Sequence, residues 1–167
     1  IFASNAGGPG LLADTYASNM DDSSYYIGAC PDCNAVLTRG HAENSALGYS
    51  GTNSGGHLIV ERSEWDQNKT GIVTNSQNND DAPSPQVGLC PGSASQSCTI
   101  FRNNYIHNNK SNGMWADNNN AGFLIEGNYI VDNDNVGIEY ETSYNVLIRN
   151  NYLARNALVD GPGNPGF

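Results

Sequence analysis

The sequence predicts a single all-β domain, a parallel β-helix in which the chain winds into a solenoid of stacked coils. Three observations favour this fold: an internal repeat of about 24 residues, an asparagine that ends each copy, and 19 glycines in 167 residues. Gly and Asn are poor helix formers, but both tolerate the left-handed conformations that the corners of a coil require.

The repeat is clearest in three segments that align without gaps, with weaker copies before them. The clear copies are 99–109, 123–133 and 146–156, and the weaker ones are 58–68, 34–44 and a run ending at Asn19. The final Asn of each copy stands at position 19, 44, 68, 109, 133 or 156, which gives intervals of 25, 24, 41, 24 and 23. The interval of 41 predicts one coil plus a long loop insertion at about 75–98.

A second mark, Gly followed by a hydrophobic residue, comes after the final Asn. It recurs at Gly48, Gly71, Gly113 and Gly137. Each coil therefore contains short strands separated by corners, and the chain contains about six coils. Side chains alternate between the two faces of a strand, and we expect Met114 and Ile138, which follow the glycine, to point into the core.

Stacking places equivalent residues of successive coils above one another, so the repeat predicts ladders of like side chains. We expect two amide ladders, an aromatic column and a row of alternating charges. Their members are Asn104, Asn128 and Asn151; Asn44, Asn68, Asn109, Asn133 and Asn156; Tyr105, Tyr129 and Tyr152; and Glu61, Arg102, Glu126 and Arg149.

The formal net charge of −10 limits the possible partners. Nucleic acids and anionic membranes both require clusters of Lys and Arg, so neither is expected. The chain has no run of 18 apolar residues, so no membrane span is expected. Neutral polysaccharides and metal cations fit this charge, and an acidic polysaccharide fits it only if a bound cation bridges the two.

Four cysteines occur in two local pairs, Cys30 with Cys33 and Cys90 with Cys98. Three disulfide connectivities are possible. A Cys90–Cys98 bond is favoured because it closes a short polar loop, and a Cys30–Cys33 bond is plausible but tight. The alternative is a zinc site built from all four thiolates, although the spacing is not that of a standard zinc ribbon. Disulfides form in oxidising compartments, so we expect a secreted or cell-surface protein.

The three clear copies resemble the coil repeat of right-handed parallel β-helix proteins, the pectate-lyase-like superfamily. Segments 25–33, 46–53 and 78–83 resemble secreted β-helix repeat proteins of actinobacteria. The resemblance implies the fold and export. Lyases, polygalacturonases and epimerases of that superfamily carry catalytic signatures that this sequence lacks: Gly40-His41 precedes Asp80-Asp81 and has no second Gly. No catalytic residue is therefore transferred from the superfamily. A leucine-rich repeat has a similar period, but its leucine pattern is absent.

Candidate chemistry is expected where the chain departs from the repeat, at the insertion and the strands beside it. On those strands, Trp115, Asp117, Glu139 and Glu141 are predicted to share one outer face. Sugars stack on exposed aromatic rings, and a pair of carboxylates about 5–9.5 Å apart is the arrangement that glycosidases use. Asp117, Glu139 and Glu141 are thus the candidate catalytic residues, with Trp115, Asn78 and Asn79 as candidate substrate-binding residues.

Asp80 and Asp81, within the insertion, are candidate ligands for calcium, which prefers oxygen donors. A calcium-dependent lyase also needs a base, for which Lys69 and Lys110 are weak candidates. The three histidines are scattered in the repeat, and no metal cluster is expected from them.

Two hypotheses follow: a carbohydrate-active enzyme, either a polysaccharide lyase or a glycoside hydrolase, and a non-catalytic extracellular module for sugar binding, adhesion or assembly. Acidic residues on a solenoid face are also often only solvated. Ile1 and Phe2 resemble the end of a preceding coil. We therefore expect either further coils beyond this segment or end-to-end self-association of chains through exposed strand edges.

Overall fold

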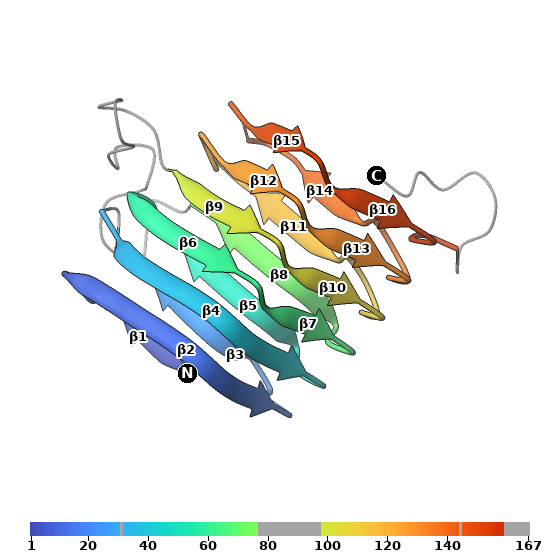
Figure 1. Cartoon of the computed structure of the whole chain (residues 1–167), viewed down its shortest axis with the longest axis horizontal. Coiled ribbons are helices and arrows are strands. Elements are labelled where there is room, and N and C mark those ends of the chain that lie inside the picture. The colour runs from blue at the N-terminus through green and yellow to red at the C-terminus, as the bar shows by residue number, and fades with distance from the viewer. Residues whose placement is uncertain (31, 77–97, 144, 159–167) are drawn as a thin grey trace.

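The computed structural model describes residues 1–30, 32–76, 98–143 and 145–158, and these residues contain strands but no helix. The strands are parallel and stack coil upon coil, with the N-terminus at one end of the stack and the last described coil at the other (Figure 1). The predicted all-β solenoid is thereby confirmed.

One sheet forms the first face of the solenoid, and each of its strands comes from a different coil. Within the described residues its order is β1 (Phe2–Ser4), β3 (Ser23–Gly28), β5 (Leu47–Thr52), β8 (Thr70–Asn75), β11 (Met114–Asp117) and β14 (Ile138–Tyr140).

A second sheet bends to form the other two faces. Its two long strands, β2 (Pro9–Ser18) and β4 (Asn34–Glu43), cross from the second face to the third. They bend at Asp14 and Arg39, both of which have positive φ angles of 54° and 52°. The same corner in later coils is occupied by Arg62, Asn103, Gly127 and Asn150, which also have positive φ.

In later coils the two faces have separate strands. The second face contains β6 (His57–Glu61), β9 (Thr99–Arg102), β12 (Leu124–Glu126) and β15 (Leu147–Arg149). The third face contains β7 (Glu64–Asp66), β10 (Tyr105–His107), β13 (Tyr129–Val131) and β16 (Tyr152–Ala154).

The core runs along the inside of the stack, where the three faces meet. Its largest fully buried side chains include Trp65, Tyr25, Tyr49 and Phe101. These rings contact one another edge to face, at 5.6 to 6.1 Å between centroids. Each coil buries few apolar groups of its own, so the continuous core depends on stacking.

The predicted amide ladders are confirmed at most of their positions. Asn104 Nδ2 donates to Asn128 Oδ1 at 3.0 Å, and Asn128 Nδ2 donates to Asn151 Oδ1 at 2.9 Å. The second ladder runs through Asn68, Asn109, Asn133 and Asn156.

Asn44 is wrong as a member of the second ladder, because Ser45 takes that position. The Ser45 backbone N–H donates to Asn68 Oδ1 at 3.0 Å. Asn44 instead occupies the preceding corner with a φ of 55°, the conformation that Asn tolerates better than most residues. The weak second copy of the repeat is therefore shifted by one residue from the alignment that the sequence suggested.

The charged row is also present. Arg102 and Glu61 form an ion pair of 2.6 Å, and Arg149 and Glu126 form one of 2.8 Å. All four residues lie in register on the second face. Glu61 is buried, whereas the Arg149–Glu126 pair is more exposed and contributes little to stability by itself. The row as a whole favours one register of stacking.

Among the cysteines, Cys30 and Cys33 form a disulfide. The alternative of a zinc site made from all four thiolates is therefore wrong, because two of the thiolates are already used. Cys98 is disulfide-bonded as well, and Cys90 lies outside the described residues.

Candidate functional site

The first face carries four of the site residues that the sequence singled out, Trp115, Asp117, Glu139 and Glu141. Strands β11 and β14 pair so that Met114 lies beside Ile138 and Trp115 beside Glu139. Met114 and Ile138 are buried, while Trp115 and Glu139 are partly exposed, so the predicted inward and outward phase is confirmed. Trp115, Asp117, Glu139 and Glu141 thus share the outer surface of this face.

Hydrogen bonds connect this group. Trp115 Nε1 donates to Glu141 Oε1 at 2.9 Å, and the Asn112 side chain donates to Glu139. Partial burial, with a smaller contribution from the negative charge of Glu141, raises the pKa of Asp117. The face therefore presents the indole of Trp115 and two carboxylates, Glu139 and Glu141, that accept hydrogen bonds. It also presents the carboxyl group of Asp117, which retains its proton to a higher pH than usual.

The other candidates of the sequence cannot be placed beside this group. Asn78, Asn79, Asp80 and Asp81 lie outside the described residues.

A second cluster, which the sequence did not predict, lies on the third face. His41, Glu64 and Tyr105 follow one another in register on strands β4, β7 and β10. Two residues further along the same strands, Asp66 pairs in register with His107. Residues i and i+2 of a strand point to the same side, so these five side chains share one surface.

The two histidines bind carboxylates of neighbouring coils in a crossed pattern. His41 Nε2 lies 2.7 Å from Asp66 Oδ1, and His107 Nε2 lies 3.0 Å from Glu64 Oε1. Asp66 is only 5% exposed, whereas Glu64 and His41 are half-buried. We call His41, Glu64, Asp66, Tyr105 and His107 the histidine–carboxylate cluster. Neutral imidazoles beside carboxylates can transfer protons or bind metal ions.

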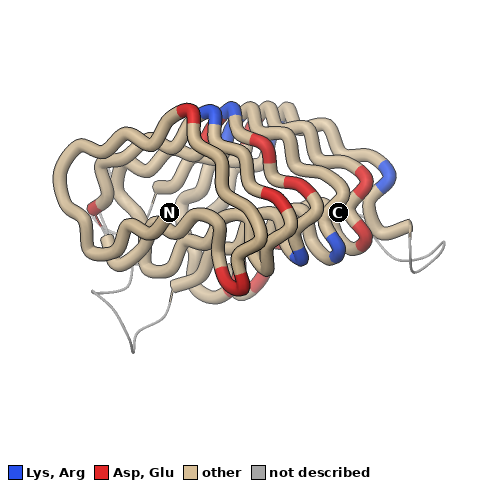
Figure 2. The backbone as a smooth tube through the Cα atoms, turned by 90° about the horizontal axis from the view of Figure 1, so that it is seen from below, with Lys and Arg blue, Asp and Glu red and all other residues tan. Residues whose placement is uncertain are grey.

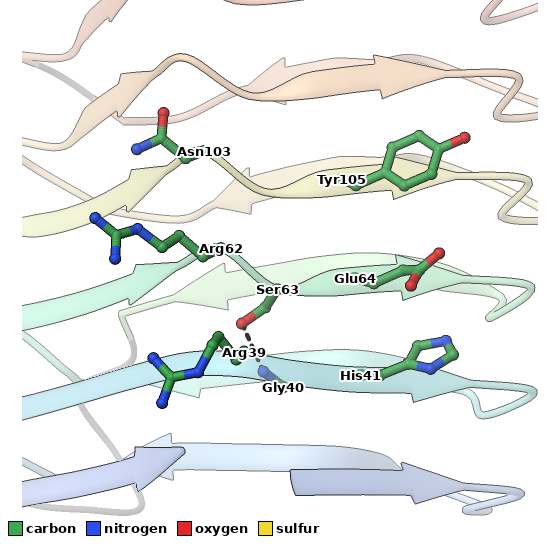
Figure 3. A pocket seen from close by; sticks show the side chains of 8 residues that line it. All are labelled: Arg39, Gly40, His41, Arg62, Ser63, Glu64, Asn103 and Tyr105. Atoms are coloured by element: carbon green, nitrogen blue, oxygen red, sulfur yellow. Dashed lines mark hydrogen bonds between the residues drawn. The ribbon is translucent and has the colours of Figure 1, made fainter. Parts of the chain in front are cut away.

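A shallow groove of about 480 Å³ runs beside this cluster, where the second face turns into the third. Figure 3 shows His41, Glu64 and Tyr105 in one column on successive coils and Arg39, Arg62 and Asn103 in a second column at the corner. Between the columns, the Gly40 N–H donates to Ser63 Oγ at 3.0 Å. The groove thus has a cationic side and an acidic, imidazole-bearing side.

The two arginines of the groove differ in how strongly they are engaged. Arg39 forms two hydrogen bonds to Asp14, at 2.6 and 2.7 Å, and this contact lowers the pKa of the Asp14 carboxyl. Arg62 is 4.0 Å from Glu61, and its side chain is 62% exposed. Arg62 is therefore the guanidinium better placed to meet a ligand.

The predicted aromatic column continues from the groove along the third face. Tyr105 and Tyr129 have ring centroids 5.6 Å apart, and Tyr129 and Tyr152 stack in parallel at 4.6 Å. These three rings are between 41% and 51% exposed, unlike the aromatic residues of the core. Tyr105 also stacks on His107 at 3.8 Å, which connects the column to the histidine–carboxylate cluster.

Charge on the third face is mainly negative near the histidines. Glu43, in register beside Asp66, accepts a hydrogen bond from the Tyr16 hydroxyl, so the carboxylates of Glu43, Glu64 and Asp66 gather on two adjacent coils. Partial burial, with a smaller contribution from Glu64, raises the pKa of the Tyr105 phenol. Figure 2 shows acidic positions on several successive coils of the side that it displays. Such a surface favours a cation or a neutral ligand close to the carboxylates.

Comparisons with known proteins agree with the architecture. The family model described as "Right handed beta helix region" matches residues 91–166. This match covers less than half of the chain. Together with the stacked parallel strands of the described residues, it supports a right-handed β-helix repeat protein. No curated protein and no solved structure matches the chain.

Two further observations concern the environment of the protein. No helix long and apolar enough to cross a membrane occurs in the described part of the chain. The Cys30–Cys33 disulfide is compatible with an oxidising, extracellular location.

Proposed function

We propose that this protein acts outside the cell and binds a polysaccharide along its third face. The observation that carries the proposal is the column of exposed rings, Tyr105, Tyr129 and Tyr152, placed in register on successive coils. Coils repeat at about 4.8 Å. That spacing is comparable to the length of one sugar unit, so a glycan chain lying along the stack meets a ring at each step.

Aromatic side chains that are half exposed in the free protein lose little by being covered with a sugar ring. Because Tyr129 and Tyr152 stack on each other, the column presents ring edges and phenol hydroxyls to a glycan, which meets them through its C–H groups and hydroxyls. The remaining sugar hydroxyls need further hydrogen-bonding partners. The groove at the end of the column supplies those partners through Arg62, Asn103 and Glu64. Arg62 also allows a uronic acid to be bound, because guanidinium groups pair with carboxylates in a bidentate geometry.

The proposal is tested by affinity electrophoresis in gels containing neutral or uronic-acid polysaccharides. Tyr129→Ala is expected to weaken binding roughly tenfold, the typical cost of truncating a central aromatic contact. Tyr129→Phe keeps the ring and should retain most of the affinity. Phe2→Ala, which removes an exposed ring from the first face, serves as the control. The proposal fails if no polysaccharide retards the protein, or if Tyr129→Ala binds as well as the parent.

A second candidate function is glycan cleavage on the first face, as the sequence suggested. The observation that favours it is the raised pKa of Asp117 near the carboxylate of Glu141. Glycosidases pair a carboxyl that holds its proton with a second, ionised carboxylate, and an exposed Trp115 can hold the sugar between them. Glu139 is the third candidate catalytic residue, and calcium bound near Asp80 and Asp81 remains a proposal.

Cleavage is tested by incubating the protein with a panel of polysaccharides, with and without calcium, and measuring new reducing ends and unsaturated uronates. Activity lost in both Asp117→Asn and Glu141→Gln, but kept in Tyr129→Ala, would place the reaction on the first face. Trp115→Ala distinguishes the two faces by binding: it should not change retardation if the glycan lies on the tyrosine column. Absence of any product on all substrates would contradict this second function.

A further inference from the structure

We propose that His41, Glu64 and Asp66 bind a divalent transition-metal ion, with zinc as the best match. One imidazole nitrogen and two carboxylate oxygens of these residues all lie within 4.8 Å of one another. This site differs from a cysteine-based zinc site. It shares Glu64 with the proposed glycan groove, but zinc binding can be measured without any glycan present.

The backbone holds the three ligands rigidly. Glu64 and Asp66 are residues i and i+2 of strand β7, so their side chains leave the same side of the strand, and His41 lies in register with Glu64 on the neighbouring strand β4. Strands β4 and β7 both belong to the second sheet, and none of the three ligands lies on a loop. An ion can therefore be bound without a rearrangement of the chain.

The donor set selects the kind of ion. Calcium and magnesium prefer six or more ligands that are all oxygen, whereas imidazole nitrogen combined with carboxylate oxygen suits zinc and related transition metals. Zinc at a catalytic-type site has three protein ligands and one exchangeable position. His41, Glu64 and the groove that they line leave such a position open towards solvent.

The hydrogen bond between His41 and Asp66 already brings together two of the atoms that would bind the metal ion. Their Nε2 and Oδ1 atoms are 2.7 Å apart, a hydrogen bond in which either the imidazole or the carboxyl group supplies the proton. Two ligands of a tetrahedral zinc ion at about 2.1 Å are separated by about 3.4 Å, so the ion can replace that proton after a small side-chain movement. Asp66 is nearly buried, and its side-chain partners in the described structure are His41 and the Gln67 amide, at 3.2 Å.

Groups around the ligands fix their orientation, as is usual for metal sites. His107 Nε2 holds Glu64 Oε1 at 3.0 Å from the opposite side, and the Tyr16 ring packs edge-on against the His41 ring at 5.3 Å. The nearby carboxylate of Glu43 adds negative charge, while Arg39 is engaged by Asp14. A bound cation would offset the repulsion between the three carboxylates.

The test is isothermal titration of the whole chain, freed of metal with a chelator and dialysed, using zinc chloride alone. We expect one zinc ion per chain. His41→Ala and Glu64→Gln should each weaken the affinity at least tenfold, and Asp66→Asn should do so if circular dichroism shows that it folds. Glu64 is half-buried and on the surface, so Glu64→Gln keeps the test valid even if Asp66→Asn misfolds. His57→Ala is the control, because His57 is exposed on the second face.

Cobalt provides an independent readout, since a cobalt(II) ion in a tetrahedral site that includes an imidazole absorbs visible light more strongly than the hydrated ion. We expect that band to appear with the parent and the His57→Ala control and to be lost in His41→Ala. The proposal is overturned if zinc does not bind at one ion per chain, if His41→Ala binds zinc unchanged, or if calcium displaces zinc at equal concentration.

Discussion

At the scale of single residues, a ladder asparagine inside the stack forms hydrogen bonds to the coils on both sides of its own. Asn109 donates from Nδ2 to the Trp65 carbonyl at 3.0 Å and to Asn133 Oδ1 at 2.8 Å, and its own Oδ1 accepts from the Asn68 N–H at 3.1 Å. One buried amide thus satisfies groups on the coil before it and the coil after it. Few other side chains carry both a donor and an acceptor at the required length, which explains why Asn recurs there.

We therefore predict that Asn109→Ala lowers the free energy of unfolding by about 2–4 kcal/mol, because it leaves a buried carbonyl and a buried N–H without their partners. The measurement is urea denaturation followed by circular dichroism. Lys110→Ala changes the adjacent exposed residue and should stay within about 0.5 kcal/mol of the parent. Equal stability of the two variants would contradict a structural role for the ladder.

Asp117 gives a prediction about pH. Its pKa is raised in the folded protein, mainly by partial burial, so the folded state binds more protons than the unfolded state between the ordinary pKa of an aspartate and the raised one. The free energy of unfolding therefore falls as the pH rises through that window. Above the raised pKa, the stabilising contribution of protonated Asp117 is completely lost. Asp117→Asn removes the ionisable group and should raise the melting temperature near neutral pH.

The matched measurement for this prediction is the same comparison at about pH 3, where Asp117 is protonated in both states. The advantage of Asp117→Asn over the parent should shrink there. An advantage that is equal at both pH values would mean that the gain does not come from ionisation of Asp117.

At the scale of the strand and corner, the recurring glycine is explained by the close approach of successive coils. A Cβ atom at Gly113 would lie 2.8 Å from the Gly137 carbonyl and 2.9 Å from Asn133 Nδ2 of the next coil. Gly71 faces Gly113 and Asn109 in the same way, at 2.5 and 2.9 Å. The glycine is thus required by the ladder asparagine beside it, and the two marks of the repeat have one cause.

From this geometry, Gly113→Ala is expected to cost about 1–3 kcal/mol of stability, because the strand must move away from its neighbour to fit the methyl group. Gly10→Ala is the matched control: a Cβ there meets Ala35 Cβ at 3.5 Å, an ordinary contact. Thermal unfolding of both variants checks the prediction. It is wrong if Gly113→Ala unfolds at the same temperature as Gly10→Ala.

How far the sequence predicted each element depended on the clarity of its repeat copy. Copies 99–109, 123–133 and 146–156 align without gaps, and the positions of Met114, Trp115 and the tyrosine column followed correctly. The copy at 34–44 is degenerate, and aligning Asn44 with Asn68 sets His41 opposite Trp65, which points into the core. The true register sets His41 opposite Glu64 on the surface.

A shift of one residue moves every side chain of a strand to the other face, so this small error concealed the histidine–carboxylate cluster. The His107–Glu64 contact was harder still to predict, because it joins residues 43 positions apart, across the insertion. The ungapped alignment of 58–68 with 99–109 did place Asp66 beside His107. That pairing was the signal in the sequence that could have indicated the cluster.

At the scale of the whole molecule, the stack is one-dimensional, because each strand pairs only with strands of adjacent coils. The coils at the two ends therefore present sheet edges and apolar groups. Leu147 and Ile148 of β15 are 50% and 43% exposed, whereas Ile125, which is equivalent to Ile148 on the preceding coil, is fully buried. At the other end, Phe2 and Leu11 are 70% and 72% exposed.

When these 167 residues are studied by themselves, we therefore predict that they associate end to end at high concentration, with the last described coil of one copy pairing with the first coil of the next. Such a head-to-tail contact continues the parallel register and repeats without closing, so a series of oligomers is expected instead of a defined dimer. Sedimentation velocity over a range of concentrations measures it. Ile148→Lys puts a charge on the exposed edge and should shift the distribution to monomer, while Asp134→Lys, on an exposed corner between coils, should leave it unchanged. A strict monomer at every concentration would show that the solvated edges are stable alone.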